Sequence, residues 1–411
     1  MCYVSYWGVK HALEFRHVLK EYVKNLSSIV LDPYGGSGGL AKLMLSFGKR
    51  VIYNDLNPVA YLIARYNIAK NQEDLEDMKK CLIRIREFLD NTRELFYEYC
   101  HICNRFSEVK YRVYENGDVM AYLECGHIVK SADVSSYKTS WTSISLSYNN
   151  TRFLKATSGL TLGDLFTRRN ATVIDMILSV LNECPMSAKY IVIPIIYLLS
   201  KMAFFPEGKE NINKSWKPSW AVPAYWVPRR FIEYNPRLII DTKIRNLGFC
   251  KPAKYRVGTV EEVLKRKAHI AFLNSDVANL SLPPRSVDIV TDPPYPTDIQ
   301  YGELYFFFAI LLGFKNYNQV LQNELIVNRY RGISLDDYMK RLDRHMFKIR
   351  QVTKKYAIFI VKNSKNIDKI LLTIEKYYDI KEQKDITLRK KRSRIGDYRD
   401  SYSYIVLFAK R

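Results

Sequence analysis

Short apolar runs alternate with helical patterns in the first 70 residues and again after residue 267. Each run has the length of a strand, and the segments between the runs repeat apolar residues at helical spacing. Strands that alternate with helices predict an α/β protein with a mostly parallel, doubly wound sheet, whose ligand binds at the carboxyl ends of the strands. The segments predicted to contain strands are 27–40, 49–55, 268–276, 286–295, 356–363 and 401–410, and the predicted helices are 58–70, 301–313, 335–350 and 366–378.

About 200 residues, 71–267, interrupt this alternation. A crossover between parallel strands does not need that length, so the interruption predicts an inserted domain. We therefore expect a discontinuous core, 1–70 and 268–411, around an insert at 71–267. The insert is predicted to hold a helix at 72–98, a hairpin that turns at Asn116-Gly117 and a Trp- and Pro-rich segment at 206–236.

The chain is strongly basic: its 411 residues include 64 Lys and Arg against 42 Asp and Glu, a net charge of +22. Such an excess favours a polyanionic partner, because each phosphate contact releases condensed counterions. The alternative is that proteins of the source organism are basic in general. Within the chain, the run RKKRSR at 389–394 is either an exposed hairpin tip or a phosphate clamp. Three tryptophans of the insert either stack on unpaired bases or belong to a proline-stiffened loop over the core: Trp216, Trp220 and Trp226.

Seven cysteines, an odd number, predict free thiols or a metal site rather than a framework of disulfides. The two most apolar runs, 190–199 and 304–314, are far shorter than the roughly 20 residues that span a bilayer. The first residues also lack the pattern of a signal peptide. We therefore expect a soluble, cytoplasmic protein.

A glycine-rich loop follows the first predicted strand. In DPYGGSGGLA, Gly36, Gly38 and Ala41 fit the G-x-G-x-x-G/A pattern, and Asp55 comes 19 residues after Gly36 at the tip of the next strand. Such glycines let the backbone approach a ligand, and the acid accepts hydrogen bonds from ribose hydroxyls. The pattern alone suits a dinucleotide, S-adenosylmethionine or a tight turn without ligand. Asp276 also ends a strand, where it is either an acceptor for an adenine amino group or a helix cap.

A second motif, Asp292-Pro293-Pro294-Tyr295, directly follows the apolar stretch SVDIVT. Two prolines stop a strand abruptly, because each fixes φ and removes a backbone donor. Together with the glycine loop, the motif resembles the amino-methyltransferases, which methylate exocyclic amines of nucleobases. More narrowly, LDPYGGSGG, NDLNPVAYL and DPPYPTDIQYGELYFFF resemble adenine-specific DNA methylases that carry a zinc ribbon, the DUF1156-like group.

The resemblance implies a Rossmann-like class I methyltransferase fold with an antiparallel last strand and S-adenosylmethionine as cofactor. It also covers YWGVK at 6–10, a segment that helps to hold the methionine part of the cofactor in many relatives; for Trp7 the alternative is core packing. The cofactor contacts that it implies are Trp7, Lys10, Asp32, Tyr34, Gly36, Gly38, Asp55 and Asp276.

The chemistry of an exocyclic amine explains the motif. Its lone pair is delocalised into the ring, so the nitrogen is a poor nucleophile. Asp292 can accept one amino hydrogen and the Pro293 carbonyl another, which directs the lone pair toward the methyl group. Tyr295 can stack on the base, which must leave the double helix to be reached.

The insert contains the spacing Cys100-x2-Cys103, then Cys125-x-His127. Three thiolates and an imidazole suit a tetrahedral zinc ion, and the arrangement at 98–130 resembles a zinc ribbon. The second pair departs from the usual C-x2-C, so His101 and Cys81 are alternatives to His127 as fourth ligand. Buried thiols without metal are a further alternative.

These features predict a site-specific DNA methyltransferase that acts on an exocyclic amine, N6 of adenine in preference to N4 of cytosine, with target recognition in the insert. One alternative is methylation of an RNA base, for example at guanine N2. Another is a non-catalytic zinc-containing DNA-binding protein on a methylase core that has lost its activity.

Overall fold

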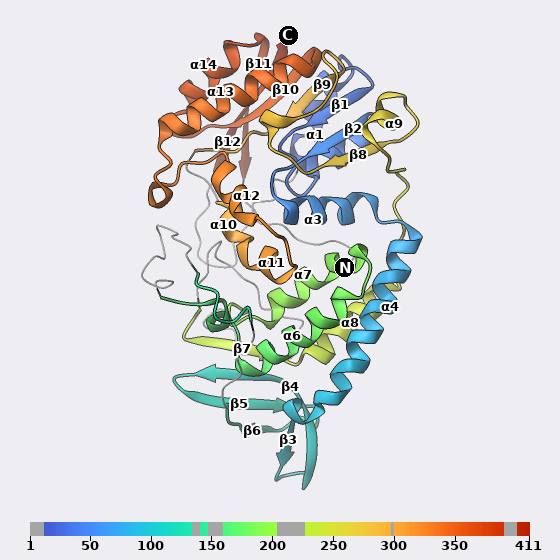
Figure 1. Ribbon diagram of the computed structural model, residues 1–411, viewed down its shortest axis with the longest axis vertical. Helices are drawn as coiled ribbons and strands as arrows, with labels where there is room; N and C mark the ends of the chain where they lie inside the picture. Colours follow the sequence, from blue (N-terminus) through green and yellow to red (C-terminus); the bar gives the residue numbers. More distant parts are fainter. Residues whose placement is uncertain (1–11, 134–139, 147–158, 204–226, 297–299, 390–400) are drawn as a thin grey trace. The chain divides into compact units, whose positions relative to one another are not determined.

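The computed structural model describes residues 12–133, 140–146, 159–203, 227–296, 300–389 and 401–411 (Figure 1). These residues form two compact units. The insert unit comprises the described residues of 71–252 and 304–315, and the core unit comprises those of 12–70, 253–303 and 316–411. The predicted insert, 71–267, therefore differs from the insert unit at its end, and the short segment 304–315 is an addition that the sequence did not indicate.

The core unit is built on a seven-stranded sheet with the order β11-β12-β10-β9-β1-β2-β8. The five strands from β10 to β8 are parallel, whereas β12 is antiparallel to both β10 and β11. This is the class I methyltransferase fold, a Rossmann-like sheet with an antiparallel last strand, and it confirms the predicted fold class. The strands are β1 (Ile29–Asp32), β2 (Arg50–Asn54), β8 (Ile270–Leu273), β9 (Val287–Thr291), β10 (Thr353–Lys362), β11 (Asp379–Arg389) and β12 (Ser401–Lys410).

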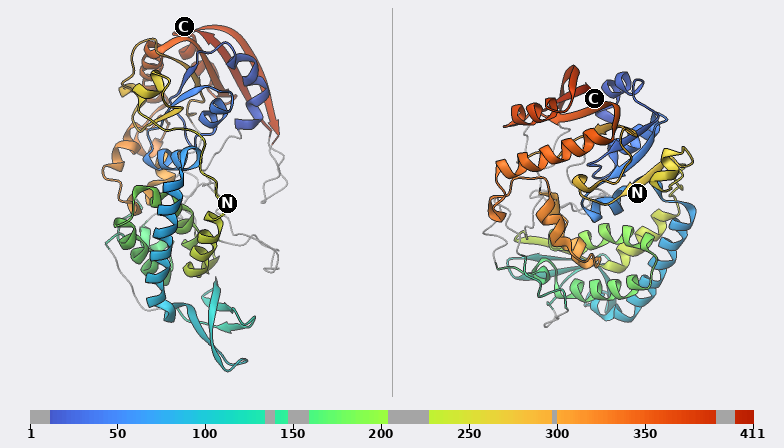
Figure 2. Two further views of the ribbon diagram at one scale, coloured as in Figure 1. Left: turned by 90° about the vertical axis from the view of Figure 1, so that its right-hand side faces the viewer. Right: turned by 45° about the horizontal axis from the view of Figure 1, so that its top comes forward.

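Helices cover both faces of this sheet (Figure 2). On one face, α13 and α14 pack on residues such as Leu31 and Ile289. On the other face, α1, α2 and α3 pack on residues such as Val30 and Val290. Neighbouring residues of a strand point to opposite faces, so each buried strand reads as a continuous apolar run. The helices of the core unit are η1 (Ala12–Phe15), α1 (Arg16–Val23), α2 (Gly39–Ser46), α3 (Pro58–Ala69), α9 (Val260–Leu264), η4 (Val277–Asn279), α10 (Tyr301–Leu304), α12 (Tyr317–Asn323), η5 (Arg329–Arg331), α13 (Leu335–Val352) and α14 (Ile367–Glu375).

Local sequence explains where several helices begin. Asn57 caps α3 by accepting a hydrogen bond from the backbone of Val59, and Pro58 occupies the first helical position.

Strand β11 was not predicted, because its alternating polar residues gave no apolar run. The predicted helix at 301–313 is divided into α10 and α11 (Phe306–Leu311), and α11 belongs to the insert unit.

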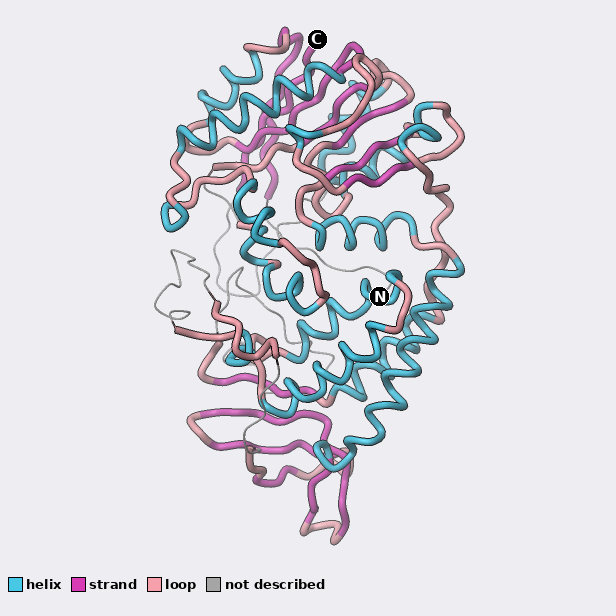
Figure 3. Tube along the Cα trace, in the orientation of Figure 1, coloured by secondary structure: helices cyan, strands magenta, loops and turns pink. Residues whose placement is uncertain are grey.

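The insert unit contains a second sheet, in which β3, β4, β5 and β6 are neighbours in this order and β7 also pairs with β4. Figure 3 draws strands in magenta and helices in cyan. Strands β4 and β5 form the predicted hairpin, and its two turn residues, Asn116 and Gly117, both have positive φ. That conformation is the one that a two-residue hairpin turn requires. The strands are β3 (Tyr97–Cys100), β4 (Arg105–Glu115), β5 (Asp118–Leu123), β6 (Ile128–Lys130) and β7 (Arg230–Tyr234).

Helix α4 packs on α6, α7 and α8 within the same unit. A disulfide between Cys81 of α4 and Cys184, just after α6, joins two of these helices. The expectation of free thiols is therefore wrong for these two residues, because the fold places them together across 103 residues of sequence. The helices of the unit are α4 (Gln72–Leu89), η2 (Asp90–Phe96), η3 (Leu162–Leu165), α6 (Arg168–Asn182), α7 (Met186–Leu199), α8 (Pro236–Leu247) and α11.

A buried ion cluster ties the second sheet to α6. Glu233 of β7 accepts hydrogen bonds from Arg112 of β4 at 2.9 Å and from Arg169 of α6 at 3.2 Å. All three side chains are at most 2% exposed, and Tyr114 donates to the other oxygen of Glu233. Removal of one partner would leave a buried charge uncompensated, so the cluster holds these elements in one arrangement.

None of the helices in the described part of the chain combines the length and the apolar character needed to cross a lipid bilayer.

Candidate active site

Four aspartates follow four neighbouring strands of the core sheet. Asp32 is the last residue of β1, Asp55 follows β2, Asp276 comes shortly after β8, and Asp292 follows β9. Because these strands are parallel and lie in the order β9-β1-β2-β8, their carboxyl ends meet at one edge of the sheet. The fold therefore brings the two predicted motifs together.

The glycine loop between β1 and α2 is held mainly by β2. Tyr53 donates a hydrogen bond to the Gly36 carbonyl at 2.6 Å, and the Gly36 N–H donates to Asp55 Oδ2 at 2.8 Å. Gly36 and Gly38 have positive φ, and a Cβ on Gly38 would lie 2.5 Å from Ile68 of α3. Backbone conformation and close packing thus require glycine at position 38, before any ligand is considered.

Asp55 is bonded to the backbone through both of its oxygens. Oδ2 accepts from Gly36, and Oδ1 accepts from the Asn57 N–H at 2.8 Å. Burial raises the pKa of Asp55 to about 6, although these two hydrogen bonds oppose the shift. Each carboxylate oxygen has a further lone pair, so a pair of ribose hydroxyls can still be accommodated.

Asp276 has protein partners already. Its Oδ1 lies 3.0 Å from His345 Nε2 of α13 and accepts from the Ala278 N–H at 2.9 Å, which caps η4. Burial alone would raise the pKa of Asp276, but the hydrogen bonds from His345 and Ala278 outweigh it and lower the pKa. Tyr34 of the glycine loop is bonded to the other side of the same ring, with its hydroxyl 2.9 Å from His345 Nδ1.

The Asp292-Pro293-Pro294-Tyr295 motif adopts a compact arrangement after β9. The Tyr295 hydroxyl donates to Asp292 Oδ1, and its ring is only 6% exposed. Lys362 of β10 places its Nζ 5.7 Å from the centre of this ring. The Tyr295 side chain is thus turned inward, toward Asp292.

Asp32 differs from the other three aspartates. It is 2% exposed, and neither of its carboxylate oxygens has a hydrogen bond of normal geometry among the residues that the structure describes. Burial raises the pKa of Asp32 well above its usual value, the nearby Asp292 and Asp55 raise it further, and the backbone N–H of Tyr34 opposes them only in part. A buried carboxyl group without partners is rare in folded proteins and indicates a place for a cationic or donor ligand.

The four predicted metal ligands of the insert unit also come together. Ligand atoms of Cys100, Cys103, Cys125 and His127 all lie within 4.8 Å of one another. The three sulfurs are 3.5, 3.2 and 3.7 Å from His127 Nδ1. Of the two alternatives for the fourth ligand, Cys81 is in a disulfide, and His101 packs its ring against Tyr99.

No family model matches the chain, and no curated protein matches it. Among solved structures, the chain is similar to the tRNA (m1A58) methyltransferase TrmI from Aquifex aeolicus, with 13% sequence identity and a TM-score of 0.19. The match covers 43% of this chain and spans 58% of the length of that protein. A similarity with so low a TM-score does not support a fold assignment. The fold class is assigned from the strand order of the core sheet instead.

Several predicted residues lie outside those whose side chains the structure describes. They are Trp7, Lys10, Trp216, Trp220, Trp226 and the basic run at 389–394.

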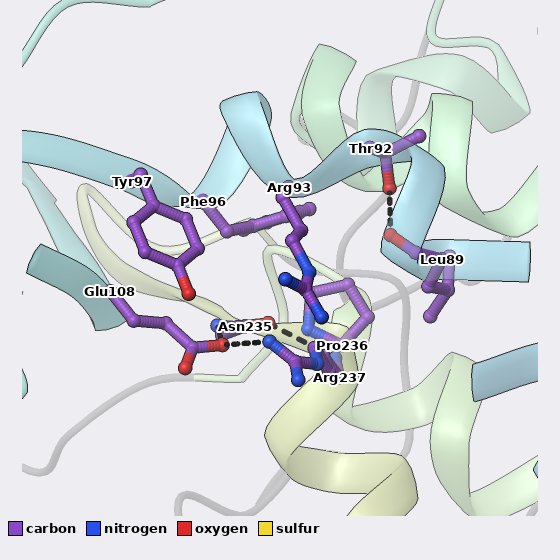
Figure 4. A pocket seen from close by; sticks show the side chains of 9 residues that line it. All are labelled: Leu89, Thr92, Arg93, Phe96, Tyr97, Glu108, Asn235, Pro236 and Arg237. Carbon is purple, nitrogen blue, oxygen red and sulfur yellow. Dashed lines mark hydrogen bonds and ion pairs between the residues drawn. The ribbon is translucent and has the colours of Figure 1, made fainter. Parts of the chain in front are cut away.

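A pocket in the insert unit has an empty volume of about 230 Å³, open solvent included. Figure 4 shows that Glu108 lies within it and accepts hydrogen bonds from Asn235 and Arg237. None of the predicted site residues lines this pocket.

Three groups at this edge of the core sheet escaped the sequence analysis. Tyr53 lies in a buried strand, and Tyr338 and His345 lie on the buried side of α13. In the sequence, each therefore looks like an ordinary core residue. A polar ring in an otherwise apolar stripe was the available signal for His345.

We expect Asp32→Asn to stabilise the fold near neutral pH. The native state raises the pKa of Asp32 above the unfolded value of 3.8, so native Asp32 keeps a proton that the unfolded chain releases. The stability of the wild type is therefore lost progressively as the pH rises above about 4, and asparagine removes this loss. Denaturant unfolding from pH 4 to 8 should show a gain of about 1–3 kcal/mol at pH 7 that shrinks toward pH 4.

The control is Asp288→Asn. Asp288 is also buried, but it accepts hydrogen bonds from the backbone N–H groups of Ser27, Lys355 and Tyr356. This variant should lose stability at neutral pH. A gain of the same size for both variants would mean that the missing hydrogen bonds of Asp32 do not destabilise the protein.

Proposed function

We propose that the protein is an S-adenosylmethionine-dependent methyltransferase that acts on an exocyclic amino group of a flipped base in DNA, with N6 of adenine favoured. The observation that carries this proposal is the buried Asp32 carboxyl group, whose oxygens have no hydrogen bond of normal geometry from the described residues, beside Asp292 at the end of the neighbouring strand. The first group suits a cation, and the second suits an amine.

The residues present fit the cofactor. S-adenosylmethionine supplies a methyl group on a sulfonium, which an amine lone pair can take up. Asp32 would offset the positive charge of its methionine part, and Asp55 would accept from its ribose hydroxyls. Both carboxyl groups have raised pKa values in the protein alone, so a cationic ligand would favour their ionised forms.

The Asp292 motif would grip the target amine. Tyr338 donates to the Pro294 carbonyl at 2.7 Å, which fixes the direction of the motif and leaves the Pro293 carbonyl as the assigned acceptor for the amine. Asp292 would accept the second amino hydrogen once Tyr295 turns from it to the base. The surplus proton of the methylated amine would pass through Asp292 to water.

The distribution of charge supports DNA binding by the core as well as by the insert. Residues 71–252 hold 25 Lys and Arg against 20 Asp and Glu, whereas the rest of the chain holds 39 against 22. Residues 97–130, which include the cysteine cluster, hold four against five. In this proposal the core makes most of the phosphate contacts, and the insert recognises the target.

The cysteine cluster would hold a structural zinc ion. Ligands at about 2.0–2.3 Å from a tetrahedral zinc lie roughly 3.3–3.8 Å apart. Two of the separations between the cysteine sulfurs and His127 Nδ1, 3.5 and 3.7 Å, fall in that range, and the third, 3.2 Å, is slightly shorter. With four protein ligands the site is closed, so it would stabilise β3 to β6 and take no part in methyl transfer.

Asp292→Ala should lower turnover by about 100-fold or more, because the variant cannot orient the amine. Its affinity for S-adenosylmethionine should stay within a few-fold of wild type, since Asp292 is assigned to the amine. The measurement is transfer of a labelled methyl group to DNA and to RNA, with nucleoside analysis of the product and calorimetry of cofactor binding.

The control is Asp379→Ala, at an exposed aspartate that begins β11. Loss of cofactor binding as the main defect of Asp292→Ala would contradict its role. N2-methylguanine in RNA as the product would replace DNA with RNA as the substrate, and the absence of transfer to either would overturn the proposal.

Tyr295→Phe should keep activity within a few-fold, because it retains the ring and removes only the hydrogen bond to Asp292. Tyr295→Ala should lose base stacking worth about 1–3 kcal/mol. The loss should appear in turnover, with little change in duplex affinity. Turnover on matched and mismatched duplexes checks this, since a mismatched base costs less to extrude and should partly rescue the alanine variant. Equal losses for both variants, without rescue, would mean that the hydroxyl group matters instead.

Purified protein should contain about one zinc ion per chain. Cys100→Ser should lose it and lower the stability of the insert, because metal binding contributes to folding free energy. Cys81→Ser, a cysteine outside the cluster, should retain the metal. Elemental analysis of protein prepared without chelator checks all three; metal-free wild-type protein would remove zinc from the proposal.

A further inference from the structure

One face of α13 reaches three segments of the candidate active site. Tyr338 contacts the Asp-Pro-Pro-Tyr motif, and His345 contacts both the glycine loop and the segment after β8. The two residues are seven positions apart, which is two helical turns, so they lie on the same side of the helix. The sequence predicted a helix at 335–350 but gave no reason to connect it with the site; the fold makes that connection.

Tyr338 is fully buried and donates its hydroxyl to the Pro294 carbonyl at 2.7 Å. Pro293 and Pro294 contribute no backbone N–H, so the usual backbone hydrogen bonds cannot fix this segment. Tyr338 supplies a fixed attachment point in their place.

His345 is 6% exposed and bridges two loops through its two ring nitrogens. Nε2 faces the Asp276 carboxylate at 3.0 Å, and Nδ1 faces the Tyr34 hydroxyl at 2.9 Å. A carboxylate accepts only, so Nε2 carries a proton, and in the neutral ring Nδ1 accepts the Tyr34 hydroxyl. A single side chain thus joins the loop after β1 to the loop after β8.

The helix that carries both residues is itself firmly held. Ser334 and Asp337 form a capping box at its start, and Leu342, Met346 and Ile349 are buried in the core against the sheet. Near its other end, Arg350 donates to the Tyr377 carbonyl at 2.8 Å. A helix anchored along its length can set a distance between groups that contact it at different turns.

We propose that Tyr338 and His345 are positioning residues for methyl transfer, which hold the amine-binding motif in register with the two loops assigned to the cofactor. The inference depends on the proposed function for its chemistry. Tyr338 acts through Pro294, and His345 acts through Tyr34 and Asp276; neither touches a reacting atom.

The two residues should differ in their kinetic effects. Tyr338→Phe removes only the bond to Pro294, so it should lower kcat about tenfold or more while the cofactor Kd stays within about twofold. His345→Leu removes both loop contacts, so it should raise the cofactor Kd about tenfold or more. His345→Gln keeps a donor and an acceptor on one side chain and should recover part of that affinity.

The matched control is Tyr378→Phe. Tyr378 is 3% exposed in the same core, and its hydroxyl is 2.7 Å from Thr353 Oγ1. This variant also loses a buried tyrosine hydrogen bond and should lose similar stability, with kcat and Kd unchanged. If Tyr338→Phe and His345→Leu behave as this control does, losing only stability, the positioning role is wrong.

Hydrogen exchange of the cofactor-free protein separates this inference from the proposed function. His345→Leu should speed exchange in peptides that cover 32–38 and 274–279, and Tyr338→Phe should speed it in the peptide that covers 292–303. Tyr378→Phe should change neither. Faster exchange in a protein that binds no S-adenosylmethionine would retain the positioning role and overturn only the proposed function. Unchanged exchange would overturn the positioning role whatever the activity.

Discussion

The convergence of four aspartates at one edge of a parallel sheet is the constraint on which the candidate site depends. Asp32, Asp55, Asp276 and Asp292 stand at the ends of adjacent strands. Burial raises the pKa of Asp32 and of Asp55, and the nearby Asp292 and Asp55 raise the pKa of Asp32 further. Backbone N–H groups bind Asp55, His345 and Ala278 bind Asp276, and Tyr295 binds Asp292. Asp32 has no such partner among the described residues, so it is the place where a ligand would gain most.

The elements around this edge serve it in different ways. Tyr53 and Asp55 of the second strand region hold the glycine loop, and the positive φ of Gly38 together with its close packing on Ile68 requires glycine there without any ligand. Helix α13 packs on the face of the sheet opposite to α1, α2 and α3, and it contacts the glycine loop and the Asp292 motif. These contacts form in the protein without ligand, and the proposed function requires Tyr295 to turn away from Asp292.

The insert unit uses other means to hold its parts together. A cluster of three cysteines and a histidine joins β3 to the β5–β6 turn, a disulfide joins α4 to the end of α6, and Glu233 lies between two buried arginines. Each of these three interactions stabilises the unit locally, and its small second sheet could not bury a large core. Residues 97–130, which include the cysteine cluster, have little net charge, which favours a supporting role over contact with phosphates.

The sequence by itself determined the parallel core, the two motifs at strand ends and the four candidate metal ligands, because apolar runs, glycines, prolines and cysteines report local requirements. Only the tertiary structure decided which of these aspartates has no hydrogen-bond partner in the described part of the chain, because that depends on His345, which lies 69 residues from Asp276, and on Tyr295, which turns back on Asp292. It also decided that Cys81 pairs with Cys184 and that 304–315 belongs to the insert unit. Contacts between distant segments arise from packing, and local pattern carries no record of them.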